Sequence, residues 1–167
     1  MRLSKFIIIL SLISIRTFSF GQEYIFPDEV VLYSFATPDG KMMTLNREKS
    51  DRYIVYRFGT KEKIEFEFPG KTNESWKKFK YSSYLRGGGV QNEGMDLNYV
   101  YFINEGFKYI IFDTYYSADD KREIGIKIIN LKTKKTTVIR GDINTLQGTL
   151  TDFRDNHLLE KGEEIFD

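Results

Sequence analysis

The segment best suited to recognise a ligand begins with three consecutive glycines. Gly87, Gly88 and Gly89 directly follow Arg86 and begin a polar segment that runs to residue 98, called here the Gly-rich loop (residues 86–98). Ordering consecutive glycines costs conformational entropy, so a fold keeps them where the backbone needs a positive φ or a close approach. Their backbone N–H groups could cradle an anion beside the Arg86 guanidinium. The other polar side chains of this loop that could recognise a ligand are Gln91, Asn92, Glu93, Asp96 and Asn98.

The Gly-rich loop has two interpretations. As a recognition loop it would bind an anionic group, a glycan or a protein partner. As a long connection between strands, its Asx turns and glycine bulges would satisfy only its own backbone. It is not a Walker loop, because no Gly-Lys-Ser or Gly-Lys-Thr follows the glycines. Nor is it a dinucleotide-binding fingerprint, because no helix is expected after it.

A single carboxylate, Asp113, interrupts the apolar run of residues 109–116. If it is buried it needs a partner, which Arg86 or Arg122 could supply. Paired with Glu93 or Glu105, it could instead serve as acid or base in glycoside hydrolysis. Structural carboxylates on strands are commoner than catalytic ones, so we expect a structural role.

The residue types that the chain lacks exclude several chemistries. It has no Cys and one His, His157, so thiol catalysis, zinc ribbons, iron–sulfur ligation and paired-His metal motifs are excluded. A Gly-x-Ser-x-Gly nucleophile elbow is also absent from the sequence. We therefore expect no enzyme, no catalytic residue, no metal and no cofactor.

The single tryptophan, Trp76, also has two interpretations. Together with tyrosines on exposed strand faces, it could stack on a sugar ring and form part of a glycan-binding surface. More often such a residue packs at the edge of a core, and we favour that role.

The N-terminus has the pattern of a signal peptide. Arg2 and Lys5 flank a ten-residue apolar stretch, residues 6–15, and the small residues Ser19 and Gly21 mark a cleavage site after Gly21. Ten apolar residues are too few for a transmembrane helix. We expect residues 1–21 to be removed, which leaves residues 22–167 as a single domain without a membrane span, exported to the periplasm or secreted.

Cleavage changes the charge balance of the protein. The whole chain has 25 basic and 24 acidic residues, and residues 1–21 hold three of the basic ones and none of the acidic ones. The remaining chain therefore carries 22 basic and 24 acidic groups. A mildly acidic, mixed surface is not that of a nucleic-acid-binding protein.

Period-two alternation predicts that the domain is built from strands. Ile64, Phe66 and Phe68 alternate with charged residues, as in a half-buried strand. Residues 37–40 and 104–106 carry turn signals, and Gly106 is expected to need a positive φ. The run 107–116, apolar on both faces, indicates a central strand. The predicted strands cover residues 30–36, 42–46, 52–58, 63–68, 78–86, 99–103, 107–116, 123–131, 136–140 and 149–153.

Helix signals are few. Residues 142–146 could form one turn with Asp142 as N-cap, and residues 155–161 could form another short piece. The sequence therefore predicts an all-β fold: a single-domain antiparallel β-sandwich or barrel of about ten strands, with at most one or two short helical turns.

Four runs of sequence carry a resemblance to a group of small exported bacterial proteins of unknown function. They are residues 53–59 (YIVYRFG), 63–69 (KIEFEFP), 86–99 (RGGGVQNEGMDLNY) and 125–134 (GIKIINLKTK). The resemblance implies export and a β-rich fold but no activity. In architecture alone, the chain also resembles the periplasmic lysozyme inhibitors, although those usually carry a disulfide and this chain has no cysteine.

From these observations we expect an exported, non-enzymatic binding protein. Its partner is predicted to be a protein, bound through the Gly-rich loop in an inhibitor or immunity role. The alternative is a glycan- or cell-envelope-binding domain that uses Trp76.

Overall fold

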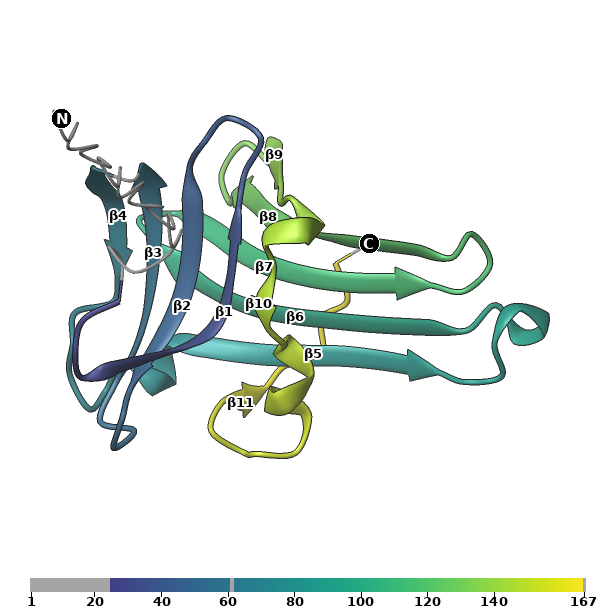
Figure 1. Cartoon of the computed structure of the whole chain (residues 1–167), viewed down its shortest axis with the longest axis horizontal. Helices are drawn as coiled ribbons and strands as arrows, with labels where there is room; N and C mark the ends of the chain where they lie inside the picture. The colour runs from purple at the N-terminus through teal and green to yellow at the C-terminus, as the bar shows by residue number, and fades with distance from the viewer. Residues whose placement is uncertain (1–24, 61, 167) are drawn as a thin grey trace, which may run out of the picture.

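Two packed β-sheets make up the fold. The computed structural model describes residues 25–60 and 62–166, so the predicted signal peptide lies outside the described residues. Sheet A has the strand order β10-β1-β2-β3-β4 and sheet B the order β11-β5-β6-β7-β8-β9 (Figure 1). All pairs are antiparallel except β11 with β5. The strands are β1 (Glu29–Ala36), β2 (Met42–Glu48), β3 (Ile54–Thr60), β4 (Lys63–Phe68), β5 (Phe79–Arg86), β6 (Met95–Asn104), β7 (Phe107–Tyr116), β8 (Lys121–Asn130), β9 (Thr136–Arg140), β10 (Gln147–Gly148) and β11 (Glu160–Lys161).

The main core lies between the two sheets. Because side chains alternate between the faces of a strand, every second residue of each strand points into this layer. Sheet A supplies residues such as Tyr33 and Tyr56, and sheet B supplies Phe102, Ile111 and Ile126, all at most 2% exposed. The all-β prediction is confirmed, and its architecture is a sandwich of two separate sheets.

A second apolar layer covers the outer face of sheet B. The side chains of Tyr99, Ile110 and Phe112 point to this face and are buried. Phe166, near the C-terminus, packs edge-on against Tyr99 at 5.4 Å between ring centroids. This layer explains why residues 107–116 are apolar on both faces. As predicted, that strand, β7, is interior, between β6 and β8.

One end of sheet B extends beyond sheet A. Figure 1 shows strands β5 to β8 running past the crossing strands of sheet A, toward the ends that carry Arg86, Met95, Tyr116 and Lys121. The segment around β10 and the 3-10 helix η5 (Leu150–Arg154) crosses over the middle of these strands. Sheet A covers one face of sheet B only where the two sheets cross. The same face is therefore accessible at this end, called here the projecting end.

Some local predictions are confirmed and others are wrong. Gly106 has a φ of 81°, and the side chain of Asp142 caps η4 (Ile143–Thr145) by accepting from Asn144 N at 2.9 Å. Residues 149–153 were expected to form a strand, but residues 150–154 form η5, because its apolar residues, Leu150 and Phe153, both pack into the core. Residues 155–161 form no helix; they end in β11, which pairs with β5. In the described part of the chain, no helix is long and apolar enough to cross a membrane.

Candidate functional site

The Gly-rich loop is shorter than predicted. Met95–Asn98 belong to β6, because they continue its pairing with β5 and β7, so the connection itself spans only residues 87–94, called here the hairpin tip. The tip contains one 3-10 turn, η3 (Val90–Asn92). Gly88 and Gly89 have φ values of 95° and 59°, which explains why glycine occupies both positions.

Polar side chains fasten the hairpin tip to itself. Arg86 Nε and Nη2 donate to the Glu93 carbonyl oxygen at 2.9 and 2.7 Å, and Asn92 Nδ2 donates to the Gly87 carbonyl oxygen at 2.7 Å. Gly94 N also donates to the Gly89 carbonyl oxygen at 2.8 Å. The Arg86 guanidinium therefore holds the loop closed.

Arg86→Ala is therefore expected to loosen the tip without unfolding the protein. The lost bonds lie at a partly exposed site, so the free energy of unfolding should fall by less than about 1 kcal/mol. Amide hydrogen exchange of residues 88–94 should become faster. Arg140→Ala, which removes an exposed ion pair with Glu123 on another strand, is the control and should leave exchange in the tip unchanged. Unchanged exchange in the Arg86 variant would show that other contacts close the loop.

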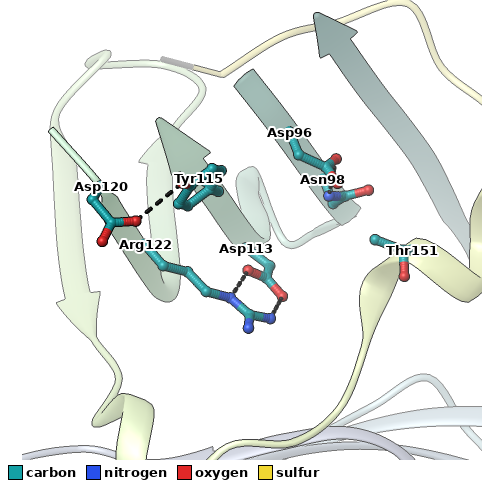
Figure 2. Close-up of a pocket in the computed structure, with 7 residues that line it drawn as sticks. All are labelled: Asp96, Asn98, Asp113, Tyr115, Asp120, Arg122 and Thr151. Carbon is teal, nitrogen blue, oxygen red and sulfur yellow. Dashed lines mark hydrogen bonds and ion pairs between the residues drawn. The ribbon is translucent and has the colours of Figure 1, made fainter. Parts of the chain in front are cut away.

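A polar pocket lies on the inner face of sheet B at its projecting end. Two rows of side chains run across neighbouring strands there: Ser83, Asn98 and Asp113 in one, and Leu85, Asp96, Tyr115 and Arg122 in the next. The rows continue the face that is apolar beneath sheet A. The cavity above them has a volume of about 440 Å³. The residues that line this pocket are Asp96, Asn98, Asp113, Tyr115, Asp120, Arg122 and Thr151 (Figure 2).

Asp113 and Arg122 form a two-bond ion pair in this pocket. Arg122 Nε and Nη2 donate to the two Asp113 oxygens at 2.8 and 2.7 Å (Figure 2). The hydrogen bond to Asp113 raises the pKa of Arg122 above its ordinary value. Of the two partners expected for this carboxylate, the structure places Arg122 on it, whereas Arg86 closes the hairpin tip.

A buried hydroxyl lies next to this ion pair. Tyr33, on β1 of sheet A, is fully buried, and its Oη has no hydrogen-bond partner among the described residues. Burial, and then the charge of Asp113, raises the pKa of Tyr33 far above its ordinary value. Tyr33 therefore remains a neutral hydroxyl beside the carboxylate.

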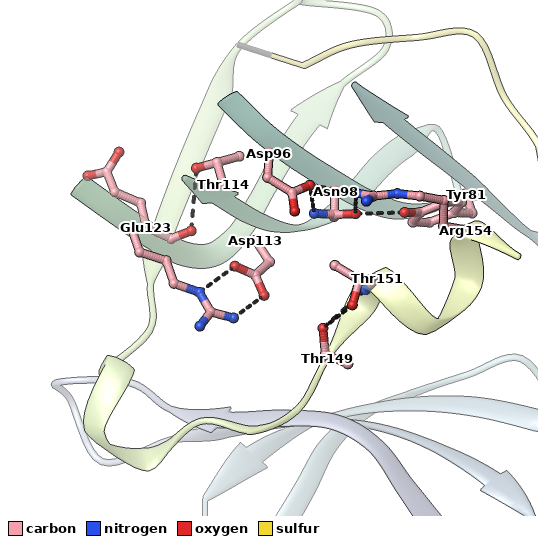
Figure 3. A network of polar contacts seen from close by, with 10 residues as sticks. Tyr81, Asp96, Asn98, Asp113, Thr114, Glu123, Thr149, Thr151 and Arg154 are labelled. Carbon is pink, nitrogen blue, oxygen red and sulfur yellow. Dashed lines mark hydrogen bonds and ion pairs between the residues drawn. The ribbon is translucent and has the colours of Figure 1, made fainter. Parts of the chain in front are cut away.

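Asn98 is the centre of a second polar network (Figure 3). Its Oδ1 accepts from Tyr81 Oη at 2.6 Å and from Arg154 Nη2 at 3.0 Å, and its Nδ2 donates to Asp96 Oδ1 at 2.9 Å. Arg154 comes from η5 and also pairs with Asp96. Burial alone would lower the pKa of Arg154, but the bond to Asp96 outweighs it, and the pKa is raised. Asp96 and Asn98, predicted as loop residues, are thus strand residues of the pocket.

The carboxylate pairs considered for hydrolysis are not assembled. Glu105 lies in the turn that precedes β7, at the opposite end of that strand from Asp113. Glu93 lies in the hairpin tip, where its carboxylate faces Arg86 at 3.5 Å. Among the described residues, no group of three or more His, Asp or Glu residues is arranged to hold a metal ion.

Trp76 is remote from both the tip and the pocket. It lies in η2 (Trp76–Lys78), before the start of β5, whereas Arg86 ends that strand. Its ring packs partly buried against the main core, and Nε1 donates to the Asp51 carbonyl oxygen at 2.8 Å. This is the core-edge position that we favoured from the sequence.

Several pocket residues were not identified as site residues from the sequence. Tyr115 could have been found, because period-two alternation places it on the same face of its strand as Asp113. Arg154 had no such signal, since it is separated from Asp96 by 58 residues in the chain.

The chain was compared with protein-family models, with curated proteins and with solved structures, and no match was found in any of the three comparisons.

Proposed function

We propose that this is an exported, non-enzymatic binding protein that recognises a protein partner through the projecting end of sheet B. One observation carries the proposal. Among the described residues, the two most exposed large apolar side chains are Val90 and Leu85, at 66% and 61%, and both lie at this end. Tyr84 and Tyr115, also at this end, are 42% and 37% exposed. Exposed apolar groups gathered on one region are typical of interaction sites.

The scaffold under these side chains is suited to recognition. Strands β5 to β8 are paired along their whole lengths, and the hairpin tip is closed by its own hydrogen bonds. A preorganised surface loses little entropy on binding. Loops held by rigid sheets commonly carry recognition, which an inhibitor or immunity role would use.

The test compares capture of a partner by variants at the two ends of sheet B. Extracts of periplasmic and secreted proteins from the source bacterium and its neighbours are passed over the immobilised protein. We expect a stoichiometric protein to be retained by the wild type and lost by the double variant Leu85→Asp/Val90→Asp. Its purified form should bind the double variant at least about tenfold more weakly, which is ~1.4 kcal/mol.

Ile103→Asp is the matched control. Ile103 is 54% exposed near the opposite end of β6, so this variant introduces the same chemical change away from the proposed surface. It should retain the partner as the wild type does. Equal retention by all three folded proteins, or retention by none, would contradict the proposal.

A further inference from the structure

We propose that the polar pocket is a second binding site, for a neutral polyhydroxylated ligand such as a sugar unit. The inference goes beyond the proposed protein recognition and rests on different residues. The cavity, at about 440 Å³, is within the range of about 300–1,000 Å³ that small-molecule sites occupy. It is open to solvent, so a ligand can enter without a movement of either sheet.

Charge pairing in the pocket favours a neutral ligand. Asp113 is paired with Arg122, and Asp96 with Arg154. An anionic ligand would have to compete with Asp113 or Asp96 for a guanidinium, and removing a partner from a largely buried carboxylate such as Asp113 is costly. A cationic ligand could pair with Asp120, but that carboxylate is exposed to solvent, where an ion pair contributes little. A neutral ligand can add hydrogen bonds to both members of a pair and leave the pair intact.

The same ion pairs retain hydrogen-bonding capacity that suits hydroxyl groups. A carboxylate has about four acceptor sites and a guanidinium five N–H donors. Arg122 uses Nε and Nη2 for Asp113, and Nη1 points away from that carboxylate (Figure 2). Asp120 uses only Oδ1 to accept from Tyr115 Oη, at 3.0 Å. A hydroxyl both donates and accepts, so adjacent hydroxyls of one ligand can satisfy carboxylate and guanidinium together, in charge-assisted bonds.

An aromatic ring borders these polar groups. Tyr115 lies in the same cross-strand row as Arg122, and its hydroxyl bond to Asp120 fixes the orientation of the ring. The partly exposed ring offers apolar surface to the C–H face of a sugar, next to donors and acceptors for its hydroxyls. The apolar ring thus matches the C–H face of a sugar, and the planar polar groups match its hydroxyl groups.

The pocket is organised before any ligand arrives. Tyr81 and Arg154 hold Asn98, and Asn98 in turn holds Asp96. Little ordering entropy is therefore lost on binding.

The experiment is a titration of the ¹⁵N-labelled full chain, followed by NMR. The probes are glucose, galactose, mannose, N-acetylglucosamine and cellobiose, with glucosamine and glucuronate as charged counterparts. At least one neutral probe should cause saturable shifts of amides in β6, β7 and β8 around the pocket. Glucuronate should bind at least fivefold more weakly than the neutral probes, and glucosamine should bind no more tightly than they do. Saturation by none of the neutral probes, shifts elsewhere, or tighter binding of a charged sugar would overturn the proposal.

Asp120→Asn and Asp119→Asn are the matched pair of variants. Both residues lie in the turn between β7 and β8, but only Asp120 lines the pocket. Asp120 has a φ of 48°, which asparagine tolerates, so the variant is expected to fold. Asp120→Asn should weaken saccharide binding at least fivefold and Asp119→Asn should not. Equal effects of the two variants would overturn the assignment of the site.

The variant Val90→Asp separates this proposal from the proposed function. It changes the hairpin tip, and Val90 is not among the residues that line the pocket. Saccharide binding should persist in this variant even where capture of a protein partner is lost. If Val90→Asp abolished saccharide binding, the ligand would be bound at the tip, and the pocket assignment would be wrong.

Discussion

Replacing Phe102 by alanine is expected to lower the free energy of unfolding by about 3–5 kcal/mol, as for other large aromatic side chains removed from a core. Phe102 is 2% exposed and lies at the centre of the aromatic cluster between the sheets. Its ring stacks on Phe68 at 4.5 Å and on Tyr109 at 4.9 Å, and it contacts Phe79 edge-on at 5.2 Å. These neighbours come from both sheets, so the cavity would open where the two layers meet. Urea unfolding measures the loss.

Phe107→Ala is the control for this prediction. Phe107 belongs to the same hairpin but is 37% exposed, so its loss should cost less than about 1 kcal/mol. The slope of unfolding free energy against urea should stay the same in both variants, since an altered slope would report a change in the surface exposed on unfolding. A loss below about 1 kcal/mol for Phe102→Ala would mean that the ring is not central to the packing between the sheets.

Glu29→Gln is expected to cost about 3 kcal/mol at neutral pH, because it leaves a buried guanidinium without its main partner. The side chains of Glu29 and Arg57 are both fully buried. Arg57 Nη1 and Nη2 donate to the two Glu29 oxygens at 2.5 and 2.8 Å, and Tyr53 Oη adds a bond at 2.9 Å. Arg57 Nε also donates to Glu67, at 2.6 Å. Because this bond remains in the variant, the expected loss of stability is at the low end of the range for a broken buried ion pair. Urea unfolding at pH 7 gives the value.

The loss from Glu29→Gln should depend on pH in one direction. Burial by itself would raise the pKa of Glu29, but the bonds and charge of Arg57 outweigh it, so the pKa lies below its ordinary value of 4.5. A carboxyl whose pKa is lower in the folded state stabilises the protein above its unfolded pKa and loses that contribution as pH falls through the folded pKa. The difference between wild type and variant should thus be constant above about pH 5 and shrink below pH 4.5.

Glu65→Gln is the control for the ion pair. Its partner Lys41 and Glu65 itself are both partly exposed, so this pair should contribute at most about 1 kcal/mol at any pH. A difference between wild type and Glu29→Gln that stays constant down to pH 3 would show that the ionised form of Glu29 is not what stabilises the fold.

Local patterns were enough to predict most of the strands. The alternation of Ile64, Phe66 and Phe68 predicted β4, and the turn signals at residues 37–40 and 104–106 predicted two of the connections. Asp142 as a helix cap was also predicted correctly. All of these features depend on residues within about four positions of one another, so a short stretch of sequence includes every residue that takes part.

Predictions failed where a distant partner decides the local structure. Residues 95–98, of which Asp96 and Asn98 are polar, follow a glycine and are expected from the sequence to be loop. Pairing of Met95 with both Arg86 and Tyr116 instead extends β6 through them. Residues 150–154 form a 3-10 helix in place of a strand, because burial of Leu150 and Phe153 in the core outweighs their β propensity.

By itself, the sequence determined the all-β class, the positions of most strands and the presence of a polar segment after Arg86, since these follow from side-chain alternation and turn chemistry. Only the tertiary structure decided where the side chains of that segment lie. Strand register brings Asp96, Tyr115 and Arg122 into one row, and η5 carries Arg154 onto Asp96 from 58 residues away. Such contacts depend on how strands pair and sheets pack, and no local spacing encodes them.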